Sequence, residues 1–170
     1  MLRRLFARLT DGPERGAALF EALVREAREP HWYVEGEVPD TIDGRFAMLA
    51  TVVALATVRL ENGDERARSA SVGLAEQFIA AMDAEHRQMG VSDPGLGKTV
   101  RKLVGALARR VDLWRRAIGG DDWNAATVSS VYRDAPVSPL AVAHTAGKLT
   151  ALRERLESAP DADLFEGRIA

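Results

Sequence analysis

The chain has 170 residues, of which 46% are hydrophobic and 28% are charged, a composition typical of a globular domain. Its formal net charge is −2, so no global attraction to nucleic acid or to an anionic membrane is expected. An electrostatic partner must therefore be bound by a local patch. The absence of cysteine excludes disulfides, thiolate metal centres, iron–sulfur clusters and cysteine nucleophiles.

Helical periodicity predominates in the first part of the chain. Residues 14–28 place apolar side chains on one stripe, and Pro30 is expected to end that helix. A second helix, capped by Asp40 or Thr41, is expected to run to about Leu60. It is apolar nearly all round, which predicts a central, enclosed element. Its most apolar run has 13 residues, fewer than the roughly 20 needed to span a bilayer.

The second part of the chain predicts four more helices. Their expected ranges are 66–89, 98–118, 123–132 and 138–157. In the helix at 98–118, the apolar stripe comprises Val100, Leu103, Val104, Leu107, Val111, Trp114 and Ile118. In the last helix, the apolar residues are Leu140, Ala143, Leu149, Leu152 and Leu156.

The two ends of the chain are expected to lie outside the helical core. Residues 1–12 are basic and partly apolar, and we interpret them as an N-terminal arm. Residues 158–170 are acidic, and we expect a frayed tail there. No strand pattern or internal repeat is found. The predicted fold class is therefore all-α, a single-domain bundle of five to seven helices within residues 1–170.

No catalytic or cofactor-binding motif is complete in the sequence. Gly97-Lys98-Thr99 is similar to the end of a phosphate-binding loop, but position 92 is Ser92 where the motif needs glycine, and no strand precedes it. The histidines show no metal-ligand spacing, and no serine lies in a nucleophile motif. We predict no cofactor, no metal and no enzymatic activity.

Basic residues gather on the helix expected at 98–118. They are Lys98, Arg101, Lys102, Arg109, Arg110, Arg115 and Arg116, opposed only by Asp112. Most of them lie off the apolar stripe, which indicates an amphipathic helix with a positive outer face. Such a face suits acidic headgroups, ribosomal RNA or an acidic partner helix. A solvated face that is balanced by the acidic loop at 35–43 is the alternative, and both remain open at this point.

Two stretches carry a family resemblance. The first is Val38-Pro39-Asp40-Thr41-Ile42-Asp43-Gly44-Arg45-Phe46, which leads into the apolar helix. The second is Met82-Asp83, then Arg87, then Met89-Gly90-Val91-Ser92-Asp93, then Lys98 and the basic helix, with Val131-Tyr132-Arg133 further on. Together they resemble the ubiquinol–cytochrome c chaperone family over about residues 15–155. The sequence departs from the family pattern at several positions, among them Ser92 and Ser130.

The resemblance implies a non-enzymatic assembly chaperone. The mitochondrial relative binds newly made cytochrome b, works with a partner protein near the ribosomal exit tunnel, and supports assembly of the cytochrome bc1 complex, respiratory complex III. We therefore expect a cytoplasmic protein that binds a cytochrome b-like membrane client, an assembly partner or the ribosome, and not DNA. A peripheral position at the inner face of the cytoplasmic membrane is left open.

We predict a partner-binding surface from these stretches and the basic helix. Its residues are Asp40, Asp43, Arg45, Arg87, Asp93, Lys98, Arg101, Lys102 and Arg109. In the structural alternative, the loop residues are caps and ion pairs that lock two loops together, with Arg45 pairing with Asp40 or Asp93. Gly44 is interpreted as allowing another helix to approach closely.

An apolar client helix would also need an exposed apolar groove. Trp32, Tyr33 and Trp123 are candidates to line it, with core packing as the alternative for each. A peripheral membrane or lipid-binding domain, or a generic protein-interaction domain, is the second functional hypothesis. An enzyme with an unrecognised site is the third.

Overall fold

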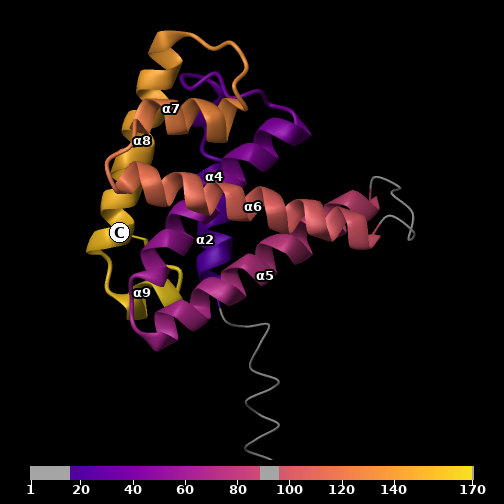
Figure 1. Cartoon of the computed structure of the whole chain (residues 1–170), viewed down its shortest axis with the longest axis vertical. Helices are drawn as coiled ribbons and strands as arrows, with labels where there is room; N and C mark the ends of the chain where they lie inside the picture. Colours follow the sequence, from indigo (N-terminus) through magenta and orange to yellow (C-terminus); the bar gives the residue numbers. More distant parts are fainter. Residues whose placement is uncertain (1–15, 89–95, 170) are drawn as a thin grey trace, which may run out of the picture.

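The computed structural model describes residues 16–88 and 96–169, and these residues form helices and connecting loops without a strand (Figure 1). The elements are α2 (Ala17–Ala27), α3 (Pro30–Tyr33), α4 (Ile42–Glu61), α5 (Glu65–Gln88), α6 (Leu96–Ile118), α7 (Trp123–Thr127), the π-helix η2 (Val128–Tyr132), α8 (Pro139–Ser158) and α9 (Asp161–Phe165). Six helices in this part of the chain have at least seven residues when η2 is joined to α7, so the predicted all-α bundle is confirmed.

Helix α4 is the centre of the bundle, as its apolar sequence predicts. Every residue from Ala47 to Leu60 except Arg59 is buried. Helices α2, α5, α6, η2 and α8 all pack around it. Small side chains such as Ala50 and Ala54 let these neighbours approach on all sides. Within the described residues, no helix combines the length and the apolar character that a membrane span requires.

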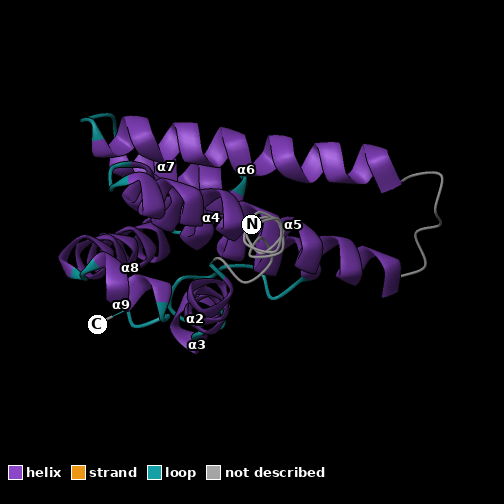
Figure 2. Cartoon of the chain, turned by 90° about the horizontal axis from the view of Figure 1, so that it is seen from below, coloured by secondary structure: helices purple, strands orange, loops and turns teal. Residues whose placement is uncertain are grey.

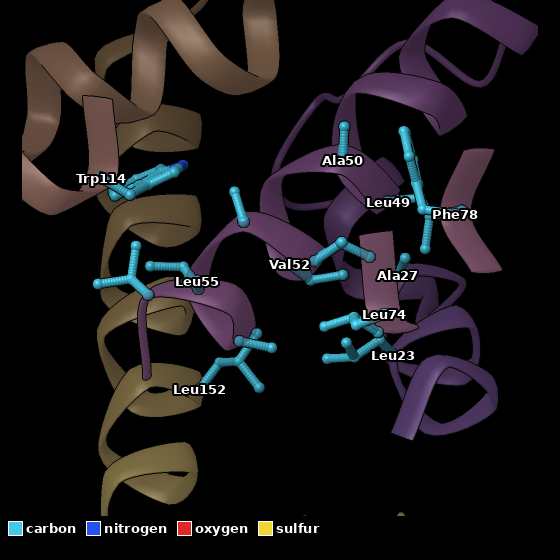
Figure 3. Close-up of a cluster of buried hydrophobic side chains, with 14 of the residues drawn as sticks. Leu23, Ala27, Leu49, Ala50, Val52, Leu55, Leu74, Phe78, Trp114 and Leu152 are labelled. Atoms are coloured by element: carbon cyan, nitrogen blue, oxygen red, sulfur yellow. The ribbon is translucent and has the colours of Figure 1, made fainter. Parts of the chain in front are cut away.

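The core lies on both sides of α4 (Figure 3). On one side Leu55 lies near Trp114 of α6 and Leu152 of α8, and on the other Leu49 lies near Phe78 of α5. All five side chains are at most 8% exposed. Burial of large aromatic and aliphatic side chains on two faces of one helix is the main source of stability in this fold.

The start of α4 is set by a threonine and a glycine. The Thr41 hydroxyl accepts a hydrogen bond from the Gly44 amide at 3.1 Å, so Thr41, and not Asp40, is the N-cap. A Cβ atom on Gly44 would lie 1.9 Å from the Pro39 carbonyl oxygen. The expected close approach at Gly44 is therefore made by the preceding loop, and the interpretation as a helix–helix contact is wrong.

The helix expected at 123–132 divides into α7 and the π-helix η2, which ends at Arg133 with a φ of 56°. The wider turn accompanies a buried polar cluster. Ser130 Oγ lies 2.6 Å from Thr51 Oγ1 and accepts a hydrogen bond from Trp114 Nε1 at 3.1 Å. Nearby, the Tyr132 hydroxyl donates to the Gly36 carbonyl at 2.5 Å. Satisfied buried polar groups of this kind select one packing arrangement.

The C-terminal residues differ from the frayed tail expected over 158–170. Residues 161–165 form α9, and Leu164 is fully buried. Arg59 of α4 donates to Asp161 at 2.7 Å, and Arg66 lies 4.6 Å from the ring centroid of Phe165. These contacts hold the segment on the bundle. The N-terminal arm expected at residues 1–12 lies outside the described residues.

Two predicted apolar stripes are only partly buried. Val104 in α6 is 45% exposed and Leu140 in α8 is 84% exposed, and Ala143 is also exposed. Figures 1 and 2 show that the second half of α5 and the first half of α6 run side by side beyond the rest of the bundle. Val104 therefore lies on a helix segment that fewer neighbours cover. Leu140 belongs to the first turn of α8, at the edge of the structure.

Candidate partner-binding site

Three grooves meet at Phe46, near the N-terminal end of α4. The α2 groove, of about 600 Å³, includes Phe20, Val24, Tyr33, Arg45, Phe46 and Met82 in its lining. The central groove, of about 300 Å³, includes Ile42, Phe46, Met82, Glu85, Leu103 and Arg110. The α6 groove, of about 680 Å³, includes Phe46, Lys98, Arg101, Lys102, Leu103 and Arg109.

Phe46 is placed between the core and the surface. It is the first large side chain of α4 that faces the bundle, and it is half-buried. Its ring centroid lies 5.7 Å from that of the fully buried Phe78. The guanidinium carbon of Arg110 lies 5.7 Å from the Phe46 centroid. Phe46 therefore connects the core to the open side of the grooves, with a cation over its ring.

The charge of the groove walls is opposite to that of the whole chain. Nine basic and three acidic side chains line the three grooves, whereas the chain carries a net charge of −2. The basic side chains therefore form a local patch around the three grooves, beside apolar side chains that line the same grooves. Such a surface attracts and orients an anionic partner.

Most of the predicted partner-binding residues come together around these grooves. Those that line a groove are Asp43, Arg45, Lys98, Arg101, Lys102 and Arg109. Asp40 lies at the edge and accepts a hydrogen bond from Arg45 Nε at 2.6 Å, and this bond holds the pKa of Asp40 below its ordinary value. Arg87 lies in the last turn of α5, but its side chain, like all of Asp93, is outside the described part of the chain.

The alternative interpretation, in which the loop residues form caps and ion pairs that lock two loops together, agrees only in part with the structure. Arg45 pairs with Asp40, five residues away, so this contact is local, and both side chains are at least 60% exposed. Asp43 does join two distant segments, because its carboxylate lies 3.0 Å from Arg133 Nη1 after η2. Both members of that pair are also exposed, and exposed ion pairs add little stability. These residues are thus available to a partner.

Arg110 has an environment unlike the other basic residues of α6. It is partly buried, Nε and Nη2 donate to the Ser130 carbonyl at 3.3 and 3.1 Å, and Nη1 donates to the Ala106 carbonyl at 3.3 Å. Burial, together with the charges of Arg133 and Arg109, lowers the pKa of Arg110 to about 10. It remains protonated at neutral pH in spite of its desolvation.

Sequence reasoning did not include Arg110, Phe46, Met82 and Glu85 among the site residues. Spacing alone could have identified Arg110, because it follows Leu103 by seven residues and so lies on the apolar stripe of α6. Phe46 was assigned to a buried helix. Its exposure depends on how α5 and α6 pack around α4, because Met82 of α5 and Leu103 of α6 line the grooves with it.

The tryptophans expected as groove candidates lie in the core. Trp32 is fully buried and donates to the Glu26 carbonyl at 2.8 Å. Trp123 packs against Trp114, with ring centroids 4.7 Å apart. Core packing, the alternative given for both, is therefore the correct interpretation. Tyr33 does line the α2 groove.

The described residues contain no group of three or more His, Asp or Glu side chains placed to hold a metal ion. The two histidines that do meet are His31 and His144, whose Nδ1 and Nε2 atoms lie 3.2 Å apart. They are in α3 and α8, and neither lines any of the three grooves. The surface around Phe46 thus combines apolar and basic side chains.

Comparisons with known proteins agree with the sequence resemblance. The sequence model of the ubiquinol-cytochrome C chaperone family matches residues 35–170, and the chain belongs to this family. The crystal structure of the Cbp3 homolog from Brucella abortus is similar, with a TM-score of 0.80 and 26% sequence identity over 100% of this chain and 96% of that chain. Among curated proteins, no sequence matches at a significant level.

Proposed function

We propose that this protein is a non-enzymatic assembly chaperone of respiratory complex III that acts from the cytoplasmic side of the membrane. Its client in this proposal is a cytochrome b-like membrane protein, held through an apolar segment with acidic groups. Membership of the ubiquinol-cytochrome C chaperone family supports the assignment. The observation that carries it is the junction of three grooves at Phe46, with basic side chains outnumbering acidic ones nine to three.

The groove walls suit a helical segment for a physical reason. An amphipathic helix binds by placing its apolar side chains in a hydrophobic groove, and Phe46, Met82 and Leu103 provide apolar surface shared between grooves. The exposed cations Lys98, Arg101 and Lys102 lie beside that surface. Rim charges of this kind mainly increase the rate of association and select the partner. The apolar contacts then determine how long the segment stays bound.

The test is capture of the client by a charge-reversed variant. We expect the triple variant R101E/K102E/R109E to lose capture of complex III subunits in crosslinked pull-downs from the native host, with an unchanged helical circular dichroism spectrum. The matched control is R68E/R116E/K148E, which changes the same charge at exposed positions outside the three grooves. Equal capture by both triple variants and the unaltered protein would contradict the proposal.

A peripheral membrane protein is the second candidate function. The exposed cations of the α6 groove favour it, because they would also attract anionic headgroups. Flotation with phosphatidylglycerol vesicles separates the two functions. Binding that is strong at low salt, lost at high salt and independent of any client would favour the membrane function. Ribosome binding through the same cations is tested by the identity of the proteins in the pull-down.

A further inference from the structure

The central groove contains a cation whose hydrogen bonds are incomplete. A guanidinium has five N–H donors. In Arg110 one on Nε, one on Nη2 and one on Nη1 are directed to the carbonyls of Ser130 and Ala106. One N–H on each Nη atom has no acceptor among the residues that the structure describes. The two remaining donors are of the kind that binds both oxygens of one carboxylate.

The surroundings of Arg110 do not supply that carboxylate. Among the described residues, no acidic side chain lies within ion-pair distance of it. Asp43, in the first turn of α4, lines the same groove but is already paired with Arg133 at 3.0 Å. Glu85 lines the same groove from α5, but it forms no ion pair with Arg110. Arg110 is thus a partly buried positive charge with two neighbouring arginines, Arg109 and Arg133, and no counter-ion in the part of the chain that the structure describes.

The apolar surface around this charge indicates the kind of group that would meet it. Ile42, Phe46 and Leu103 line the groove together with Arg110, and the Phe46 ring lies against its guanidinium. A fully hydrated anion would gain little there. An otherwise apolar helix that carries one Asp or Glu would bury its apolar side chains against these walls. Its carboxylate would then pair with Arg110 in a site of reduced polarity, where charge-assisted hydrogen bonds are stronger.

We propose that the central groove is a carboxylate-binding pocket, in which Arg110 receives an Asp or Glu side chain from the apolar face of a partner helix. This inference rests on the proposed client-binding function and adds a chemical requirement to it. A polar residue placed within an apolar segment would specify one register of the bound helix. The general basic rim selects anionic partners, whereas Arg110 would select the position of one acidic residue.

A double-mutant cycle with synthetic peptides tests the pocket. The probes are two end-capped, 18-residue helical peptides of Leu, Ala and Gln that differ at one central position of the apolar face, Glu in one and Gln in the other. We expect the unaltered protein to bind the Glu peptide at least about tenfold more tightly by calorimetry, in line with coupling energies of close charge pairs. In R110Q both peptides should bind equally.

Two further variants keep the result interpretable. Arg110 connects α6 to η2, so R110Q must first show the circular dichroism and urea midpoint of a folded protein. R110K keeps the charge but not the planar fork, and should retain only part of the preference. R116Q, a matched change at an exposed arginine of the same helix that lies outside the three grooves, should retain all of it.

The outcomes separate this inference from the proposed function. Equal binding of the two peptides by the unaltered protein, binding of neither, or a preference that survives in R110Q would each overturn the carboxylate pocket. Competition by phosphatidylglycerol vesicles that depends on Arg110 would overturn it as well, since the site would then take a phosphate. Client capture in the pull-down does not depend on these peptides, so the chaperone proposal can stand when the pocket fails.

Discussion

The two ends of α4 each carry an arginine, in opposite surroundings. At the C-terminal end, Arg59 donates to the carbonyls of Leu156 and Ala159 and to the Asp161 carboxylate, and its side chain is 18% exposed. At the N-terminal end, Arg45 pairs with Asp40 and its side chain is 65% exposed. The same residue type is thus enclosed by the C-terminal segment at one end and faces the α2 groove at the other.

This difference separates stability from recognition within one helix. At the C-terminal end of α4, two main-chain carbonyls and the Asp161 carboxylate accept three hydrogen bonds from Arg59, so its charge is paired within the fold. At the N-terminal end, Arg45, Phe46 and the nearby Arg110 border open grooves. A charge that is enclosed and paired with a carboxylate stabilises the fold, whereas charges and rings that border open grooves are available for binding.

The largest expected effect on stability is at the enclosed end. Arg59→Met should lower the free energy of unfolding by about 2 kcal/mol, because it removes hydrogen bonds from a charged donor and leaves Asp161 unpaired. Urea unfolding measures this loss. Client capture, assayed at a temperature where the variant is folded, should be unchanged. Loss of capture with unchanged stability would mean that the enclosed end also binds the partner.

A matched pair of phenylalanine substitutions distinguishes the grooves from the core. Phe46 and Phe78 are neighbours, but only Phe46 lines the grooves. Phe78→Leu should destabilise the fold by about 1 kcal/mol and leave peptide binding intact, because Phe78 is fully buried. Phe46→Leu should cost less stability, yet weaken binding of the Glu peptide severalfold through loss of the cation–ring contact with Arg110. The reverse pattern would contradict the assignment of the groove.

The smallest expected effect is a pH dependence at the junction of α3 and α8. Burial, and then the charges of Lys148 and His144, lower the pKa of His31 below 6.5, while Glu26 and Glu29 act in the opposite direction. Between that lowered pKa and 6.5, His31 binds more protons in the unfolded chain than in the folded one. The free energy of unfolding therefore falls as the pH drops through this range.

Urea midpoints of the unaltered protein and of His31→Gln, compared from about pH 7 to about pH 5, measure this contribution. The difference between the two proteins should change across that range, with the unaltered protein losing more stability on acidification. Because Tyr33 of α3 lines the α2 groove, acid should also weaken binding at the open end. Parallel pH profiles would show that the His31–His144 contact does not respond to pH.

Sequence reasoning located much of the candidate site but not its centre. The cations of α6 were found because charge and periodicity are local properties that a helix preserves. Phe46 was interpreted as part of a buried helix, since its exposure depends on where α5 and α6 lie. The same reasoning missed the role of Leu164, whose burial depends on the docking of α9 beside Arg59.

The amino-acid sequence by itself determined the all-helical class, the enclosed position of α4, the positive face of α6 and the resemblance that the family match confirmed. Each of these depends on residues within a few turns of one another or on a contiguous motif. The tertiary structure alone decided that three grooves share Phe46, that Arg110 is partly buried with no counter-ion among the described residues, and that Asp43 meets Arg133. These features arise from packing between segments far apart in the chain, and local periodicity carries no information about how such segments meet.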